Sequence, residues 1–142
     1  MKDLYIEGTK GVFFTPTIRL NAKTGKCEIL GESYIEDAPQ FYEPILNWID
    51  TYVKEVKGTL TWDFRLVYFN TSSSKTILNL LQTLKNYEKQ GGKVVINWYY
   101  PDDNDDLLAE GEDFIEDSGL QINLIPYILE DEDEEEDEFT LD

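Results

Sequence analysis

The stretch of sequence that decides the fold of this chain is TLTWDFRLVYF, residues 59–69. Large apolar side chains alternate with smaller or polar ones along it, which is the period of a β-strand with a buried face. At its end, Val67 and Phe69 add apolar side chains on the opposite parity, as expected of a strand at the centre of a sheet. The alternation therefore predicts a central strand whose core-facing side chains run from Leu60 to Tyr68.

A turn rich in hydroxyl side chains follows this strand directly. It reads NTSSSK, residues 70–75, and leads into apolar residues at helical spacing that stop at a pair of glycines, residues 91–92. Asn70 or Thr71 can cap this helix, which we expect to run through Gln90. One or two polar side chains suffice for capping, so four hydroxyl side chains in a row exceed that need.

Upstream, residues 3–35 read as short extended segments, beginning with residues 4–7. Residues 17–21 and 27–30 predict a hairpin, because the turn-forming residues 21–26 separate them. Asp37 is the expected cap of a helix that ends near Gly58. Pro44 lies inside that helix, where proline is expected to kink or restart it.

Downstream, residues 94–100 predict a strand, residues 105–117 an acidic helix and residues 121–129 a final strand. Strands that alternate with helices favour a partly parallel sheet with helices packed against it. The fold class we expect is therefore α/β, with a small mixed β-sheet and an N-terminal hairpin.

The net charge of −18 is unevenly distributed over the 142 residues. Ten acids fall in residues 130–142, and removing them leaves −8 for the rest. We expect one folded domain, residues 1–129, and an acidic, disordered tail, residues 130–142. Neither part has the clustered Lys and Arg of a nucleic-acid binder.

Several chemistries are excluded by composition. The chain has no histidine and one cysteine, Cys27, which removes histidine-based catalytic triads, cysteine zinc cages and internal disulfides. A calcium loop starting at Asp102 requires glycine and glutamate where Leu107 and Asp113 stand, so we interpret the acids of residues 102–106 as a turn and helix start. No apolar run long enough to span a membrane and no secretory signal is present. We expect a cytoplasmic protein without cofactor or metal.

The hydroxyl-rich turn has three interpretations. Its residues cap the helix, cradle a phosphate, or accept a phosphoryl group. A phosphate-binding loop is disfavoured, because the turn has no glycine and no Walker spacing. A phosphorylated side chain here would meet the positive end of the helix dipole, worth about 0.3–1 kcal/mol at a surface. It would also add roughly −1.5 to −2 charge, enough to alter partner binding.

Four segments resemble those of one known family, in the same order along the chain. YFNTSSSK, residues 68–75, resembles the tyrosine-x-asparagine-threonine-serine-serine-x-lysine signature of the SiaC family of bacterial regulatory phosphoproteins. Residues 15–18 (TPTI), 31–36 (GESYIE) and 95–100 (VINWYY) resemble its other motifs, and the likeness covers residues 9–128. Ile35 departs from the family's usual proline, and the acidic tail is not part of the pattern.

The resemblance implies a fold like that of bacterial anti-sigma-factor antagonists (STAS-like) and a partner-switching role without catalysis. It implies a kinase of the histidine-kinase-like ATPase type, a metal-dependent phosphatase and a diguanylate cyclase as target, hence cyclic di-GMP signalling and biofilm formation. Carried over by position, the phosphoacceptor is Thr71, with Ser72 and Ser73 as fallbacks. The unphosphorylated form is expected to bind and activate the cyclase.

A partner-binding surface is expected around the phosphoacceptor. We assign to it the following residues: Tyr34, Glu36, Asn70, Ser72, Ser73, Lys75, Asn97, Trp98 and Tyr100. Tryptophan and tyrosine often anchor interfaces, but the periodicity of their strands equally predicts Trp98 and Tyr68 in the core. Lys75 either steadies a phosphate or is simply solvated.

Two other functions remain open. The chain could act as an acidic scaffold or adaptor that holds a basic partner through residues 130–142. It could also be a carboxylate enzyme that uses the acids at positions 102, 103, 105 and 106 as metal ligands, although their spacing is poor for that purpose.

Overall fold

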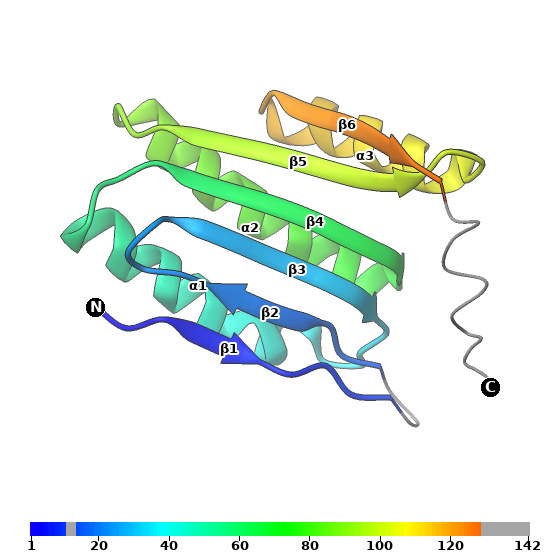
Figure 1. Cartoon of the computed structure of the whole chain (residues 1–142), viewed down its shortest axis with the longest axis horizontal. Helices are drawn as coiled ribbons and strands as arrows, with labels where there is room; N and C mark the ends of the chain where they lie inside the picture. The colour runs from blue at the N-terminus through cyan, green and yellow to red at the C-terminus, as the bar shows by residue number, and fades with distance from the viewer. Residues whose placement is uncertain (11–13, 129–142) are drawn as a thin grey trace.

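The computed structural model describes residues 1–10 and 14–128 of the chain. Within them, a twisted sheet carries three helices (Figure 1). The strands are β1 (Leu4–Ile6), β2 (Thr17–Leu20), β3 (Lys26–Ser33), β4 (Leu60–Phe69), β5 (Val94–Pro101) and β6 (Ile122–Tyr127). The helices are α1 (Ala38–Glu55), α2 (Thr71–Lys89) and α3 (Asp105–Ser118).

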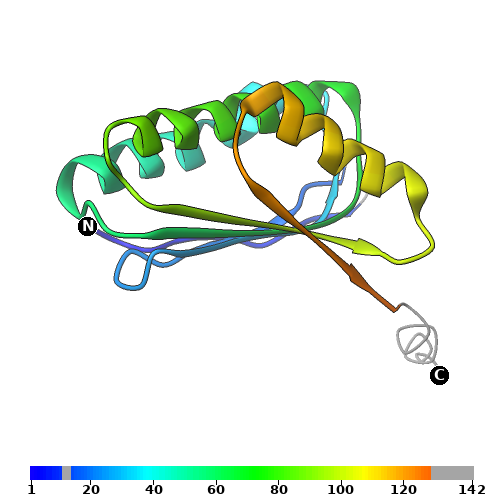
Figure 2. The same cartoon turned by 90° about the horizontal axis from the view of Figure 1, so that it is seen from above.

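The strands are arranged side by side in their order along the chain. β1, β2 and β3 pair antiparallel, and β3 to β6 pair parallel, so the sheet is mixed. All three helices of the described residues cover one face of the sheet, and none of these residues forms a helix on the other face (Figure 2). The expected fold class, with its N-terminal hairpin, is confirmed. The hairpin's second strand is longer than expected and also forms the parallel neighbour of β4.

The core lies between the helices and the sheet. Leu60, Trp62, Phe64 and Leu66 of β4 are at most 1% exposed, as the alternation predicts. Burying such a side chain contributes about 1.5–3 kcal/mol. β4 lies in the middle of the sheet, between two parallel neighbours, β3 and β5. Helices α1 and α2 make the crossover connections that parallel neighbours require.

A β-bulge interrupts β4 near its end. Gly31 of β3 pairs with Leu66, but the next residue, Glu32, pairs with Tyr68, so Val67 is the extra residue. The bulge reverses the parity of the strand. Phe69 therefore joins the core side, with its ring 5.9 Å from that of Trp98, and Tyr68 is 47% exposed. The expectation that Tyr68 lies in the core is wrong for this reason.

Each helix begins at a polar side chain, and Asp37 and Asn70 are among the expected ones. The side chains of Asp37, Asn70 and Asn104 accept hydrogen bonds from backbone N–H groups three residues further on. The acids of residues 102–106 form the predicted turn and helix start. α1 passes through Pro44 as one helix, so a restart there is wrong. Leu129 and the acidic tail lie outside the described residues.

Candidate functional site

The hydroxyl-rich turn lies at the carboxyl end of β4, where α2 begins. Its four hydroxyl groups differ in exposure and in hydrogen bonding. Thr71 is exposed, and its side chain makes no hydrogen bond with any of the described residues. Ser72 is partly buried and Ser73 is fully buried. Ser74 is partly buried, and its hydroxyl group also makes no hydrogen bond with the described residues. The local structure therefore separates the exposed hydroxyl group of Thr71 from those of Ser72 and Ser73, which the fold holds.

Ser73 belongs to a buried network that joins three elements. Its Oγ lies 2.7 Å from Ser33 Oγ on β3 and donates to the Ser33 carbonyl at 2.8 Å. Ser33 Oγ also lies 2.9 Å from the hydroxyl of Tyr42 on α1. Burial raises the pKa of Tyr42 to about 12, so this hydroxyl stays protonated. The network ties the start of α2 to β3 and α1.

Asn70 and Ser72 fasten the turn to the segment between β3 and α1. The Asn70 side chain donates to the Ile35 carbonyl at 2.9 Å, and its backbone N–H donates to Ser33 at 3.1 Å. Ser72 Oγ accepts from the Ala38 N–H at 3.4 Å and donates weakly to the Glu36 carbonyl at 3.5 Å. These bonds place residues 34–36 beside Thr71, as expected.

The first turn of α2 has free donors next to Thr71. The N–H of Ser73 is taken by the Asn70 side chain and that of Ser74 by the Asn70 carbonyl. The N–H groups of Thr71 and Ser72 make no hydrogen bond with the described residues. Lys75 is exposed and lies one helical turn from Thr71, on the same side of α2. A phosphate on Thr71 would therefore meet two N–H groups, the helix dipole and a cation.

An exposed aromatic pair lies beside this turn. Tyr34 is 43% exposed and Tyr68 is 47% exposed, and their ring centroids are 6.0 Å apart. The bulge at Val67 turns Tyr68 to the surface, and Tyr34 precedes the segment that Asn70 holds. Sequence reasoning missed Tyr68 at the surface, although the tyrosine belongs to the family signature.

Asn97 and Trp98 lie in the middle of β5, so the structure does not bring them to the strand ends beside Thr71. Trp98 is 1% exposed, and its indole N–H donates to the Leu107 carbonyl at 2.9 Å. Its assignment to a partner surface is wrong, and its assignment to the core is confirmed. Tyr100 is partly buried against the core.

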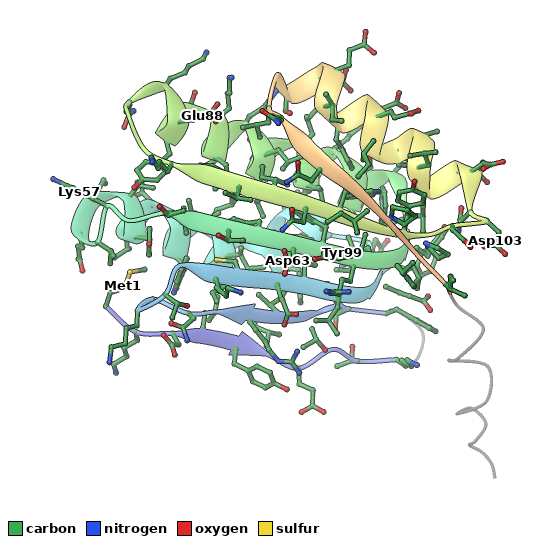
Figure 3. The ribbon with its side chains drawn as sticks, turned by 45° about the horizontal axis from the view of Figure 1, so that its top comes forward. Met1, Lys57, Asp63, Glu88, Tyr99 and Asp103 are labelled. Atoms are coloured by element: carbon green, nitrogen blue, oxygen red, sulfur yellow. The ribbon has the colours of Figure 1, made fainter. Side chains whose placement is uncertain are left out.

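Asn97 belongs instead to a polar row on the face of the sheet that carries no helix. Its side-chain amide donates to Asp63 on β4 at 2.8 Å and accepts from Asn123 on β6 at 2.9 Å. Asp63 and the nearby Tyr99 project from this face (Figure 3). The Arg65 guanidinium lies 3.7 Å from the centre of the Tyr99 ring. These contacts join β4, β5 and β6 across this face of the sheet.

Two further observations concern the single cysteine and the length of the helices. Cys27 is buried, and burial raises the pKa of its thiol far above the ordinary value, which disfavours the thiolate form. Within residues 1–10 and 14–128, none of the helices is long and apolar enough to cross a membrane.

The described residues thus form a mixed sheet with helices on one face, and the exposed hydroxyl group of Thr71 lies at the N-terminus of α2. Residues 6–127 match the family model described as SiaC family regulatory phosphoprotein. The chain belongs to the SiaC family.

Similar proteins agree with this assignment. An uncharacterised protein of Pseudomonas aeruginosa (strain UCBPP-PA14) is 29% identical over 134 residues, which cover 94% of this chain and all of that protein. The crystal structure of apo-SiaC from Pseudomonas aeruginosa matches with a TM-score of 0.79 and 29% identity, over 88% of this chain and 99% of that one.

A second structure shows a relative bound to a partner. It is the crystal structure of the diguanylate cyclase SiaD in complex with its activator SiaC from Pseudomonas aeruginosa. The match has a TM-score of 0.81 and 28% identity, over 88% of this chain and the whole of that one.

Proposed function

We propose that this protein is a phosphorylation-controlled activator of a diguanylate cyclase. Its unphosphorylated form binds the cyclase and thereby promotes cyclic di-GMP synthesis. A kinase of the histidine-kinase-like ATPase type transfers the γ-phosphoryl group of ATP to Thr71 Oγ1, with release of ADP and the hydroxyl proton. A metal-dependent phosphatase hydrolyses the phosphothreonine with water and returns the free hydroxyl group. The folded unit is residues 1–129, and residues 130–142 form a separate acidic tail.

The observation that carries the proposal is the difference in exposure among the four neighbouring hydroxyl groups of residues 71–74. Thr71 is exposed and unbonded within the described residues, whereas Ser73 is fully buried and hydrogen bonded. A kinase can reach Thr71 Oγ1 without opening the fold. The dianion would be stabilised by the helix start, so phosphorylation need not unfold the domain.

The proposed switch acts on the surface around Thr71. Tyr34, Glu36 and Lys75 lie next to it or one turn away, and the exposed ring of Tyr68 extends this surface. A partner packed over Thr71 would have to desolvate the phosphate and make room for it. A loss of about 2.8 kcal/mol weakens such binding roughly a hundredfold.

Phosphosite mapping and binding to the cognate cyclase test the proposal together. Protein purified from its own cells with phosphatase inhibitors should carry phosphate on Thr71 by mass spectrometry. Thr71→Asp should abolish cyclase binding, and Thr71→Ala should bind whether or not the kinase and ATP are present. Thr83→Ala, on the same helix, is the matched control and should be switched normally. Unchanged binding by both Thr71 variants would disprove the switch.

A further inference from the structure

A groove opens next to the Thr71 turn, where β4 parts from β5. The pairing of β4 with β5 ends at Phe64 and Trp98, but the pairing of β4 with β3 continues to Phe69. The end of β4 therefore has no strand on its β5 side. α3 follows β5 and borders the space that is left, which has a volume of about 400 Å³.

The groove has an apolar floor and an acidic rim. Val67, Tyr68 and Phe69 of β4 form the floor together with Leu107 and Ala109 of α3. Val67 is 43% exposed and Tyr68 is 47% exposed, although both are large and apolar over most of their surface. Contiguous exposed apolar surface of this kind marks interaction sites in soluble proteins.

The rim consists of Asp106, Glu110 and Asp113, which lie three and four residues apart on α3. Adjacent carboxylates at these spacings repel one another. Burial, and then the charges of Asp113 and Asp106, raise the pKa of Glu110. α3 contains seven acids and no lysine or arginine, and none of its carboxylates forms an ion pair within residues 1–10 and 14–128. The negative charge of the rim is thus uncompensated in the part of the chain that the structure describes.

We propose that this groove binds a basic amphipathic helix of a protein partner. Apolar side chains of that helix would cover Val67 and Tyr68, and its lysines and arginines would face the three rim carboxylates. The negative charge of the rim favours a cationic partner segment. An acidic or neutral segment would desolvate the rim carboxylates without pairing them. The proposal rests on the proposed function only in taking the cyclase as the owner of that helix.

The groove is continuous with the switch surface but separate from the switch itself. Tyr68 lines the groove and also contacts Tyr34 beside the Thr71 turn. Thr71 is not among the lining residues. The groove therefore supplies an attraction that does not depend on phosphorylation, and the phosphate acts on the part of the partner that covers Thr71.

The same helix provides a charge-matched control. Asp106, Glu110 and Asp113 form the rim stripe, and Asp105, Glu112 and Glu116 form a second exposed stripe that does not line the groove. The rim triple variant is Asp106→Asn with Glu110→Gln and Asp113→Asn. The control triple variant is Asp105→Asn with Glu112→Gln and Glu116→Gln. Each removes three negative charges, one of them from the first turn of α3, so both change the net charge equally.

The probe is a synthetic amphipathic peptide of about 18 residues, long enough to form a helix on binding, with leucine on one face and lysine on the other. Its binding to the full chain is measured by fluorescence anisotropy. The rim triple variant should bind about tenfold more weakly than the unmodified chain, and the control triple variant within about twofold of it. Ala109→Arg, which places a cation on the floor, should also abolish binding.

Equal weakening by both triple variants would show non-specific charge attraction and would overturn the proposal, as would no weakening by either. Repeating the measurement with the cognate cyclase separates this proposal from the proposed function. If the cyclase binds the unmodified chain and both triple variants equally, the groove proposal is wrong and the proposed function stands. If the cyclase does not bind the unmodified chain, the proposed function is wrong, and the peptide result still decides the groove.

Discussion

Neighbouring hydroxyl side chains of the turn after β4 are chemically alike but differ in what each can do. Asn70 fixes the start of α2, and the helical turn then points successive residues in different directions. Ser73 consequently faces the core, where it meets Ser33 and Tyr42, while Thr71 faces solvent. The sequence shows four hydroxyl residues in a row but not the direction in which each side chain points. Without the family resemblance, it does not distinguish Thr71 from Ser73 as the phosphoacceptor.

Alanine substitutions at these two positions should affect stability to different extents. Ser73→Ala should lower the free energy of unfolding by about 1–3 kcal/mol, because it removes a buried hydroxyl group that bonds both Ser33 oxygens. Thr71→Ala should change it by no more than about 0.5 kcal/mol, since no hydrogen bond is lost within the described residues. Urea denaturation followed by tryptophan fluorescence measures both. Equal effects of the two substitutions would contradict the difference in burial.

Two aromatic residues mark how far side-chain positions could be predicted. Trp98 follows the alternation of its strand and lies in the core, as the periodicity predicts. Its assignment to the partner surface was therefore wrong. Tyr68 breaks its strand's alternation because Val67 is inserted as a bulge opposite Gly31 and Glu32. Nothing in the alternating letters of residues 59–69 indicates that insertion, since the register of β4 depends on its pairing with a distant strand.

At the scale of elements, strands and helices were predictable because each has its own period and its own cap. Asp37 and Asn70 start helices where the sequence places them. The pairing of neighbouring strands carries no such local signal. The early end of the β4–β5 ladder at Phe64 and Trp98, which opens the groove, emerges only when the strands are assembled.

The position of α3 over the sheet depends on a glycine. A Cβ on Gly111 would lie 2.7 Å from Trp98 Cδ1 and 2.8 Å from Leu124 Cδ2, closer than packed carbon atoms approach. The Trp98 indole also donates to the Leu107 carbonyl on the preceding turn of α3. Close approach of the helix to β5 and β6 therefore requires the absence of a side chain at position 111.

Gly111→Ala should lower the stability of the protein, although alanine favours helices by about 1 kcal/mol over glycine. Forcing a methyl group against Trp98 costs about 1–3 kcal/mol, which outweighs that gain. Glu112→Ala, on the exposed side of the same helix, should change stability by no more than about 0.5 kcal/mol. Chemical denaturation compares the two, and a stabilising Gly111→Ala would show that α3 does not pack as closely as the structure has it.

On the scale of the whole molecule, the negative charge is unevenly distributed along the sequence. The tail's ten acids leave −8 on residues 1–129. Within the described residues, five lysines (positions 54, 57, 85, 89 and 93) lie at the last turns of α1 and α2 and the start of β5. In Figure 3, Lys57 and Glu88 mark that end, and Asp103 lies at the opposite one, near the groove. The groove end is therefore the acidic end, which favours the approach of a cationic partner.

Deleting residues 130–142 tests whether the tail or the domain carries the function. If the switch surface and the groove bind the partner, affinity near physiological salt should change by no more than about twofold, because a tail outside the contact is screened beyond roughly 8 Å. At low salt the association rate should fall by up to about tenfold, since the tail then adds to the attraction of a basic partner. Stopped-flow binding at both salt concentrations measures this.

A full-length tail with every Asp and Glu of residues 130–142 changed to Asn and Gln is the matched control for chain length. It should behave like the deletion, because charge rather than length produces the effect. Loss of binding at both salt concentrations with either variant would favour the acidic-scaffold alternative, in which the tail itself holds the partner. If binding is retained at physiological salt, residues 1–129 bind the partner. The acids of residues 130–142 then only increase the association rate.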